Sequence, residues 1–283
     1  MLISMKRILD YAEANGTAIG AFDVANLEGI RAAIAAAEEL HQPVIIQFAQ
    51  AHHAISPVDI LGPIMVMMAE KADVPVCVHL DHGEELEFLK KVLDMGFTSV
   101  MYDGSALNFE KNVANTCIAV ELASAYHASV EAEIGSMGRE EFGSAGAEGK
   151  AIENVYTNPA EAKEFVKRTG IDALACSFGT VHGLYLTKPV LDFELISTIR
   201  KEANVPVVMH GGSGLHESEY KECIRRGVRK INYYTYAAKA GGEAVRKMCT
   251  QKEGDVYFHD IANCGMDAMK ADVMSAMRTF SNL

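Results

Sequence analysis

The chain lacks the features that mark membrane-spanning, disulfide-rich or nucleic-acid-binding proteins. No apolar stretch approaches the roughly 20 uninterrupted residues that a membrane span needs. The six cysteines include no Cys-x-x-Cys pair, which favours reduced thiols in a cytoplasm over a disulfide framework. The net charge is -12 and there is no basic run, which argues against nucleic acid as a partner. The first residues also lack the charge order and cleavage site of a signal peptide. We therefore expect a cytoplasmic protein that binds neither membranes nor nucleic acid.

What the chain does contain is enough apolar sequence for one large core. Hydrophobic residues make up 49% of its 283 residues. Barrels of alternating strands and helices commonly use roughly 250 residues as one domain, so this length does not require two domains. The acidic balance still permits an anionic substrate, because backbone NH groups can hold a phosphate locally.

Strand-like and helix-like patterns alternate along almost the whole chain. Eight apolar runs are typical of strands buried on both faces, and they span residues 18–24, 43–49, 74–82, 98–103, 129–135, 173–179, 205–209 and 228–234. Helix-like patterns separate these runs, and the tail from about residue 260 to 277 is also helical. This alternation predicts a (β/α)8 TIM barrel with a C-terminal helical extension, as a single domain over residues 1–283. An open doubly wound sheet is the alternative, but Phe22-Asp23-Val24 is not the Gly-rich turn that usually follows its first strand.

Polar side chains stand where the predicted strands end. In a barrel these ends gather at one face, where the active site is built. The residues concerned are Asp81, His82, Asp103, Glu131, Glu133, His182, His210 and Asn232. Histidines from three strands match a zinc site with an open position, although the spacing leaves open whether His79 or His82 is the ligand from the third strand. Asp103 and Glu133 fit either a second, weaker metal position or partners that orient the histidines.

Glycines mark a predicted phosphate site beside these residues. Gly211-Gly212-Ser213-Gly214 follows the seventh strand, and residues 232–235 end the eighth, which is where barrels often bind phosphate. Glycine allows backbone NH groups to approach an oxyanion closely, whereas a tight turn without a ligand is the alternative. The Gly-rich segment 136–153 shows no periodicity, and we expect it to be a functional lid.

Five segments in order resemble the class II, zinc-dependent fructose-bisphosphate/tagatose-bisphosphate aldolase family. They are His79-Leu80-Asp81-His82-Gly83, Glu131-Ala132-Glu133-Ile134-Gly135 with Glu140-Glu141 in the following loop, Gly179-Thr180-Val181-His182-Gly183-Leu184-Tyr185, His210-Gly211-Gly212-Ser213-Gly214 and Lys230-Ile231-Asn232. The resemblance runs from about Phe22 to Thr235, and five linked motifs make it highly specific. It implies an aldehyde-lyase of carbohydrate metabolism and glycolysis, forming a homo-dimer or homo-tetramer. The enzyme would reversibly cleave fructose 1,6-bisphosphate, or a close relative, to dihydroxyacetone phosphate and an aldehyde such as glyceraldehyde 3-phosphate.

The same resemblance implies a role for individual residues. His82, His182 and His210 would bind the catalytic zinc, which decides the third-strand ligand in favour of His82, and Asp103 and Glu133 would form a second divalent position. Asp81 would be the acid/base at the C4 oxygen and Glu141 the base at the dihydroxyacetone phosphate carbon. Substrate contacts would come from Gly183, Gly211, Gly212, Ser213, Asn232, Tyr234 and Thr235. Backbone oxygens near Val181, Gly183 and Gly211 would be able to take a monovalent cation, Na⁺ or K⁺.

The chain departs from the family pattern where the aldehyde half of the sugar would sit. Fructose-type members typically carry an Asp, and tagatose-type members a small residue, where this chain has Tyr234. The loop segment 138–142 also differs from the paired glycines often found there. Alternative substrates are therefore tagatose 1,6-bisphosphate or another ketose 1-phosphate. A metal-dependent barrel hydrolase would usually need His-x-His after the first strand, and a silent, non-catalytic subunit would predict eroded ligands; neither pattern is present.

Overall fold

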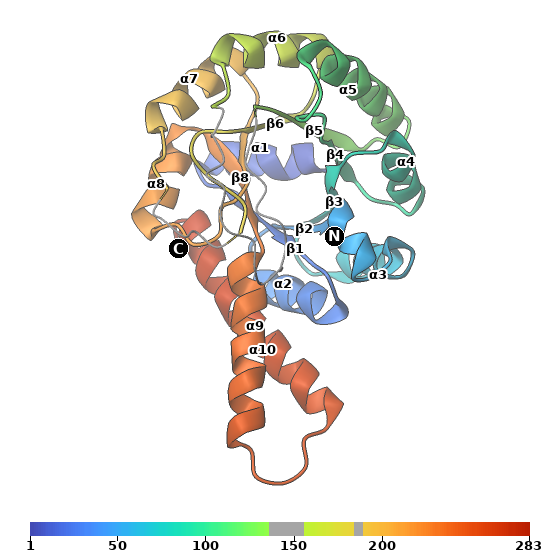
Figure 1. Ribbon diagram of the computed structural model, residues 1–283, viewed down its shortest axis with the longest axis vertical. Helices are drawn as coiled ribbons and strands as arrows, with labels where there is room; N and C mark the ends of the chain where they lie inside the picture. Colours follow the sequence, from blue (N-terminus) through green and yellow to red (C-terminus); the bar gives the residue numbers. More distant parts are fainter. Residues whose placement is uncertain (136–155, 184–188) are drawn as a thin grey trace.

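Eight parallel strands close into a barrel in the order of the sequence (Figure 1). The computed structural model describes residues 1–135, 156–183 and 189–283. The strands are β1 (Ile19–Asp23), β2 (Val44–Ala49), β3 (Val76–Gly83), β4 (Ser99–Tyr102), β5 (Ser129–Ile134), β6 (Ala173–Cys176), β7 (Val207–Met209) and β8 (Val228–Tyr233). The predicted (β/α)8 fold is confirmed.

A helix follows each strand on the outside of the barrel, and one more helix precedes the first strand. The helices are α1 (Met5–Asn15), α2 (Leu27–Leu40), α3 (Val58–Lys71), α4 (Leu86–Asp94), α5 (Phe109–Ser124), α6 (Pro159–Thr169), α7 (Phe193–Ala203), α8 (Glu217–Arg226), α9 (Thr235–Gln251) and α10 (Phe258–Phe280), with a short 3-10 helix η1 (Gln50–Ala54) after β2. Local sequence explains several helix starts. Asn158, for example, accepts hydrogen bonds from the amides of Ala160 and Glu161, and Pro159 occupies the first helical position, as expected for an Asn-Pro start.

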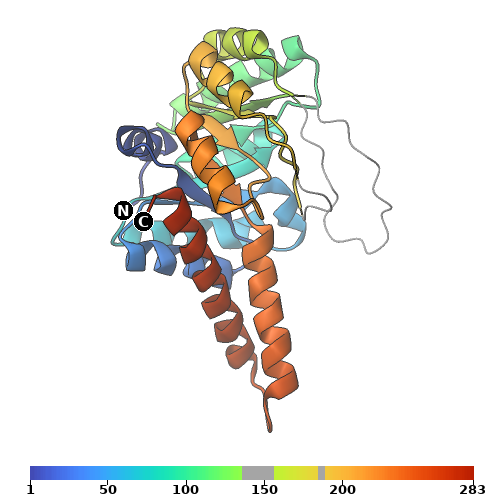
Figure 2. The ribbon, with the colours of Figure 1, turned by 90° about the vertical axis from the view of Figure 1, so that its left-hand side faces the viewer.

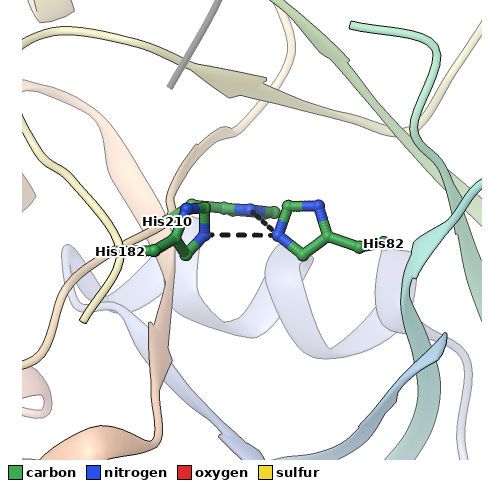
Figure 3. Close-up of side chains that lie close together, drawn as sticks. All are labelled: His82, His182 and His210. Atoms are coloured by element: carbon green, nitrogen blue, oxygen red, sulfur yellow. Dashed lines mark hydrogen bonds between the residues drawn. The ribbon is translucent and has the colours of Figure 1, made fainter. Parts of the chain in front are cut away.

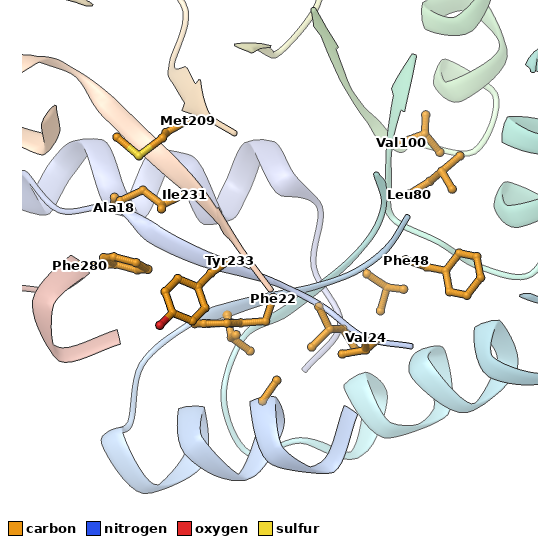
Figure 4. Packing of buried hydrophobic residues seen from close by; sticks show 14 of the residues in the cluster. Ala18, Phe22, Val24, Phe48, Leu80, Val100, Met209, Ile231, Tyr233 and Phe280 are labelled. Carbon is orange, nitrogen blue, oxygen red and sulfur yellow. The ribbon is translucent and has the colours of Figure 1, made fainter. Parts of the chain in front are cut away.

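Two hydrophobic cores hold the barrel together. The outer core lies between strands and helices, and Figure 4 shows Phe22, Tyr233 and Phe280 packed there. Their rings meet edge to face, at 5.9 Å between the centroids of Phe22 and Tyr233 and 6.2 Å between those of Tyr233 and Phe280. Such contacts add to the burial of apolar area.

The inner core is closed from below by α1, which the sequence analysis did not predict. Met5, Ile8, Leu9 and Ala12 are buried and pack beneath the inward-facing residues of the strands. Their spacing of three and four residues is the helical signal that was available in the sequence. Because α1 closes the other end of the barrel, a site can form at the C-terminal ends of the strands.

The predicted C-terminal extension is present as a pair of helices. α9 and α10 run together away from the barrel, as Figures 1 and 2 both show. The end of α10 returns to the barrel, where Met277 and Phe280 are buried. No helix in the described ranges is long and apolar enough to cross a membrane.

Candidate metal and substrate site at the barrel mouth

Three histidine rings converge at the C-terminal end of the barrel. His82 ends β3, His182 follows β6 and His210 follows β7, and their rings turn toward one another (Figure 3). We call these residues the histidine cluster. The Nε2 of His82 lies 3.2 Å from Nε2 of His182 and 3.0 Å from Nδ1 of His210. Nitrogens bound tetrahedrally at a zinc distance of about 2.0–2.1 Å would be about 3.3 Å apart. The donor set therefore fits a divalent cation such as zinc.

A backbone irregularity brings His82, and not His79, into this cluster. Residues alternate along a strand, so Cys77, His79 and Asp81 face the barrel interior while Leu80 packs outward. The pairing of β3 with β4 shifts register between Leu80 and Gly83, and His82 has φ 45°. A bulge of this kind re-aims a side chain, here toward the mouth.

Carboxylates surround His82 on its outer side. The Nδ1 of His82 is 2.7 Å from Oδ2 of Asp103, and Oδ1 of Asp103 accepts hydrogen bonds from the amide and hydroxyl of Ser105. The Oε2 of Glu133 lies 4.0 Å from Nδ1 of His82 and 3.8 Å from Nδ1 of His210. The contact of Asp103 is of the kind that orients a metal-binding histidine. His82, Asp103 and Glu133 also lie close enough to share an ion, so both sequence interpretations remain predictions.

The carboxylates make His82 basic. Burial disfavours the charged ring, but Asp81, Asp103 and Glu133 outweigh it and raise the pKa of His82 to about 10. A cation that binds at Nε2 must therefore replace a proton, and its affinity will fall at low pH.

Asp81 lies beside the histidine cluster and is almost completely buried. The amide Nδ2 of Asn232 donates to its Oδ1 at 2.9 Å, and its Oδ2 is 3.8 Å from Nε2 of His82. Burial favours the neutral acid, but His82, His210 and Lys230 outweigh burial and hold the pKa of Asp81 well below its usual range. The side chain is thus an ionised base, able to accept a proton from a group in the mouth.

A second set of buried polar residues lies under the mouth. The Nε2 of His210 lies 2.7 Å from Oε1 of Glu131, which leaves Nδ1 facing the histidine cluster. The Nζ of Lys230 is 2.9 Å from the other oxygen of Glu131. His79 lies on this level too, with Nδ1 2.8 Å from Oγ of Ser99, and burial lowers its pKa to about 3.

The predicted phosphate residues gather around the ends of β7 and β8. Gly211 has φ 62°, and a Cβ there would lie 2.3 Å from the carbonyl oxygen of Val181, so only glycine allows the loops after β6 and β7 to meet. The amide of Tyr234 donates to Oγ of Ser213 at 3.1 Å. α9 begins at Thr235 with no side-chain cap from Tyr234. Amides at such a helix start are suited to an anion.

Four residues, from β1, β2, η1 and the position directly after β8, form what we call the Tyr234 cluster, namely Asp23, Gln47, His52 and Tyr234. Nε2 of Gln47 donates to Oδ2 of Asp23 at 2.9 Å, and the rings of His52 and Tyr234 lie 4.8 Å apart. Among the residues that the structure describes, Oδ1 of Asp23 is buried without a hydrogen-bond partner. Burial and the nearby Asp81 raise the pKa of Asp23 well above its usual value, so this carboxyl favours its neutral form.

The sequence analysis identified only Tyr234 of this cluster. The signal for the others was present, because Asp23 ends the first strand, Gln47 interrupts the apolar second strand and His52 follows it. A cavity of about 350 Å³ adjoins the cluster between α2, α9 and α10, and its lining includes Asp23 and Tyr234 but none of the three clustered histidines.

Some predicted site residues lie outside the described residues. Glu141 and the predicted lid segment 136–153 fall in the range 136–155, and Leu184 and Tyr185 of the third motif fall in the range 184–188. Gly183 is described and has φ 100°.

Comparison with known proteins agrees with this arrangement over the whole chain. The family model described as "Fructose-bisphosphate aldolase class-II" matches residues 3–282. A "Fructose-bisphosphate aldolase" of Geobacillus stearothermophilus is 40% identical over 285 residues, 99% of this chain and 97% of its own length. A "Probable fructose-bisphosphate aldolase" of Bacillus subtilis (strain 168) is 38% identical over 284 residues, with 99% and 98% covered. The X-ray structure of the YdjI aldolase from Escherichia coli K12 matches with a TM-score of 0.87 and 34% identity, covering 99% of this chain and 97% of that one.

Proposed function

The chain belongs to the class II fructose-bisphosphate aldolase family, a metal-dependent family of lyases, and we propose that it is a zinc enzyme that reversibly cleaves fructose 1,6-bisphosphate. The products are dihydroxyacetone phosphate and glyceraldehyde 3-phosphate. One observation carries the proposal: nitrogens of His182 and His210 lie 3.2 and 3.0 Å from Nε2 of His82, and the buried carboxylate of Asp81 lies 3.8 Å from the same atom.

The chemistry needs a place for negative charge and a base. A zinc ion held by the histidine cluster would supply a Lewis acid that stabilises negative charge on the oxygens next to the breaking bond. Asp81 takes the proton of the C4 hydroxyl as the C3–C4 bond breaks, so C4 becomes the aldehyde carbon and the electron pair stays with the C3 fragment. Glu141 then donates a proton to C3. His82, His210 and Lys230 outweigh burial and hold the pKa of Asp81 low, so its carboxylate is ionised and free to accept the proton of the C4 hydroxyl.

The remaining site residues bind the substrate. The start of α9 and the Gly211–Gly214 turn hold the phosphate of dihydroxyacetone phosphate, with Ser213, Asn232 and Thr235 as side-chain partners and Gly183 and Gly212 as close backbone neighbours. Asp103 and Glu133 take a second divalent ion, and the carbonyls near Val181, Gly183 and Gly211 take Na⁺ or K⁺. We assign the enzyme to the cytoplasm, as a homo-dimer or homo-tetramer.

A second candidate substrate follows from the Tyr234 cluster. This cluster combines a phenol, a buried imidazole and a carboxyl that favours its neutral form, so it offers hydrogen bonds to hydroxyl groups. Tagatose 1,6-bisphosphate, or a ketose 1-phosphate with a different distal group, is the alternative substrate on this ground.

The test is a cleavage assay on a panel of ketose phosphates, with and without chelator. We expect cleavage of fructose 1,6-bisphosphate that chelator abolishes and zinc restores. Full activity after exhaustive chelation would contradict the metal-dependent mechanism. Cleavage restricted to the tagatose epimer or to a ketose 1-phosphate would select the second candidate.

A further inference from the structure

A buried lysine links the two halves of the proposed machinery. Nζ of Lys230 donates to Oδ1 of Asn232 at 2.7 Å and lies 2.9 Å from Oε2 of Glu131. Beyond these neighbours, Nδ2 of Asn232 donates to Asp81 at 2.9 Å, and Oε1 of Glu131 lies 2.7 Å from Nε2 of His210. One ammonium group thus stands between the residue proposed as the acid/base and a residue proposed as a metal ligand.

The barrel topology explains how the side chain of Lys230 reaches both Asn232 and Glu131. Lys230 and Asn232 are two residues apart on β8, so both face the barrel interior, one below the other. Glu131 faces inward from β5, and the lysine stem spans the interior from β8 to meet it. Lys230 and Glu131 are both 0% exposed, so water does not screen the pair.

The positive charge of Lys230 compensates the buried negative charge of Glu131. His79, Asp81 and Glu131 lie close enough together to hold a cation, and Lys230 already brings a positive group to Glu131. A buried carboxylate without a partner would be strongly unfavourable, so the lysine allows Glu131 to stay ionised and to accept a hydrogen bond from His210.

We propose that Lys230 is a positioning residue that holds Glu131 against His210 and Asn232 against Asp81, and so couples metal retention to the orientation of the acid/base. The proposal rests on the proposed roles of His210 and Asp81. Among the described residues, the direct contacts of Lys230 are with Glu131 and Asn232, and its charge also acts on Asp81 through space.

The experiment compares Lys230→Met with Arg229→Met. Arg229 is the next residue along β8 and also forms an ion pair, 2.7 Å from Glu13, but on the side of the strand away from the mouth. Unfolding in urea, zinc affinity by competition with a chelator, kcat and KM are measured for both variants. Both should lose stability. Lys230→Met alone should lower kcat, by about 10- to 100-fold and more than it raises KM, and weaken zinc binding by about 10-fold.

The double variant Lys230→Met/Glu131→Gln separates the effect of Lys230 on His210, through Glu131, from its effect on Asp81, through Asn232. It removes both charges of the Lys230–Glu131 pair, so residue 131 is not left as an unpaired buried charge. The introduced amide oxygen can still accept a hydrogen bond from His210, so zinc affinity should recover. The arm through Asn232 remains broken, so kcat should stay low. If Lys230→Met does not fold, the double variant carries the kcat test by itself.

Three results would overturn the proposal. Equal changes of kcat and zinc affinity in Lys230→Met and Arg229→Met would mean that Lys230 only stabilises the fold. Recovery of kcat in the double variant would mean that the lysine only neutralises Glu131. A wild-type protein that binds no zinc would remove the ligand that Lys230 is meant to support. Wild type that binds zinc but cleaves nothing contradicts the proposed function instead, while the chelator competition still tests the metal arm.

Discussion

Two neighbouring regions of the barrel mouth carry buried carboxyl groups whose pKa values are shifted in opposite directions. On the side of the histidine cluster, positive neighbours outweigh burial and hold the pKa of Asp81 low. In the Tyr234 cluster, burial and the charge of Asp81 both raise the pKa of Asp23. When the environment shifts the pKa values of two acids in opposite directions, the two acids can take different roles in catalysis. On this ground we propose that Asp81 moves the proton, whereas Asp23 offers hydrogen bonds as a neutral carboxyl group.

Individual residues of the two regions also differ in their hydrogen bonds. In the histidine cluster His82 and His210 each have a carboxylate partner on the ring nitrogen that faces away from the cluster. In the Tyr234 cluster, Oδ1 of Asp23 and Oε1 of Gln47 are buried and have no hydrogen-bond partner in the described part of the chain. Buried polar atoms of this kind call for a hydrogen-bond partner, and a sugar hydroxyl group, which can both donate and accept, would supply one. We infer that the first region performs the reaction and the second selects the aldehyde half.

The largest expected effect is the loss of a histidine. His82→Ala, His182→Ala and His210→Ala should each abolish zinc retention and cleavage, because three protein ligands leave little redundancy. Metal content and cleavage rate are the measurements. His259→Ala, on the exposed part of α10, is the matched control and should keep both. Borohydride reduction in the presence of substrate tests the alternative mechanism. A covalent substrate adduct on a lysine would contradict the zinc mechanism and indicate a Schiff base.

This part of the site was largely predictable from sequence, for a physical reason. Parallel strands place their C-terminal ends together, so a polar residue that ends an apolar run is directed to one face of the fold. Asp81, Asp103, Glu133, His210 and Asn232 were found by that rule. It could not choose between His79 and His82, because the bulge in β3 reverses the alternation on which the rule depends.

Other features depended on distances that local sequence does not contain. Lys230 and Glu131 meet across the barrel from β8 and β5, and neither spacing nor composition predicts that contact. The Tyr234 cluster could have been found in part, because Asp23 also ends a strand. Its contact between His52 and Tyr234 depends on the path of η1 after β2.

The second expected effect compares the two carboxyl groups directly. Asp81→Asn should keep zinc but lower kcat by about 100-fold or more, the scale of a lost general acid/base. Asp23→Asn replaces a group that already favours its neutral form by a neutral group of similar shape, so kcat should change by far less. Steady-state kinetics and metal content check both. If Asp81→Asn cleaves at nearly the wild-type rate, Asp81 only orients its neighbours.

The third expected effect concerns the choice of substrate. Tyr234→Asp and Tyr234→Ala should each shift the ratio of kcat/KM for fructose and tagatose 1,6-bisphosphates by about tenfold or more, because contacts to a substrate hydroxyl are gained or lost. Tyr11→Ala, on the exposed side of α1, is the control. An unchanged ratio in both variants would assign the choice of epimer to other residues, with the segment 136–153 the next to test.

The smallest expected effect is on stability, and it tests the neutral setting of Asp23. Its pKa is raised above the usual 3.8 in the folded chain, so the folded state binds the proton more tightly than the unfolded state does. The stabilisation from that proton is complete below pH 3.8 and is lost as pH rises through the folded pKa. Asp23→Asn removes this loss, so the unfolding free energy of the variant relative to wild type should increase as pH rises from acid to neutral. The change should be on the order of 1 kcal/mol, as for typical single substitutions, and urea unfolding in the presence of chelator would measure it. If the difference in unfolding free energy between variant and wild type is independent of pH, or decreases toward neutral pH, Asp23 is ionised. The pKa values of Asp23 and Asp81 would then not be shifted in opposite directions.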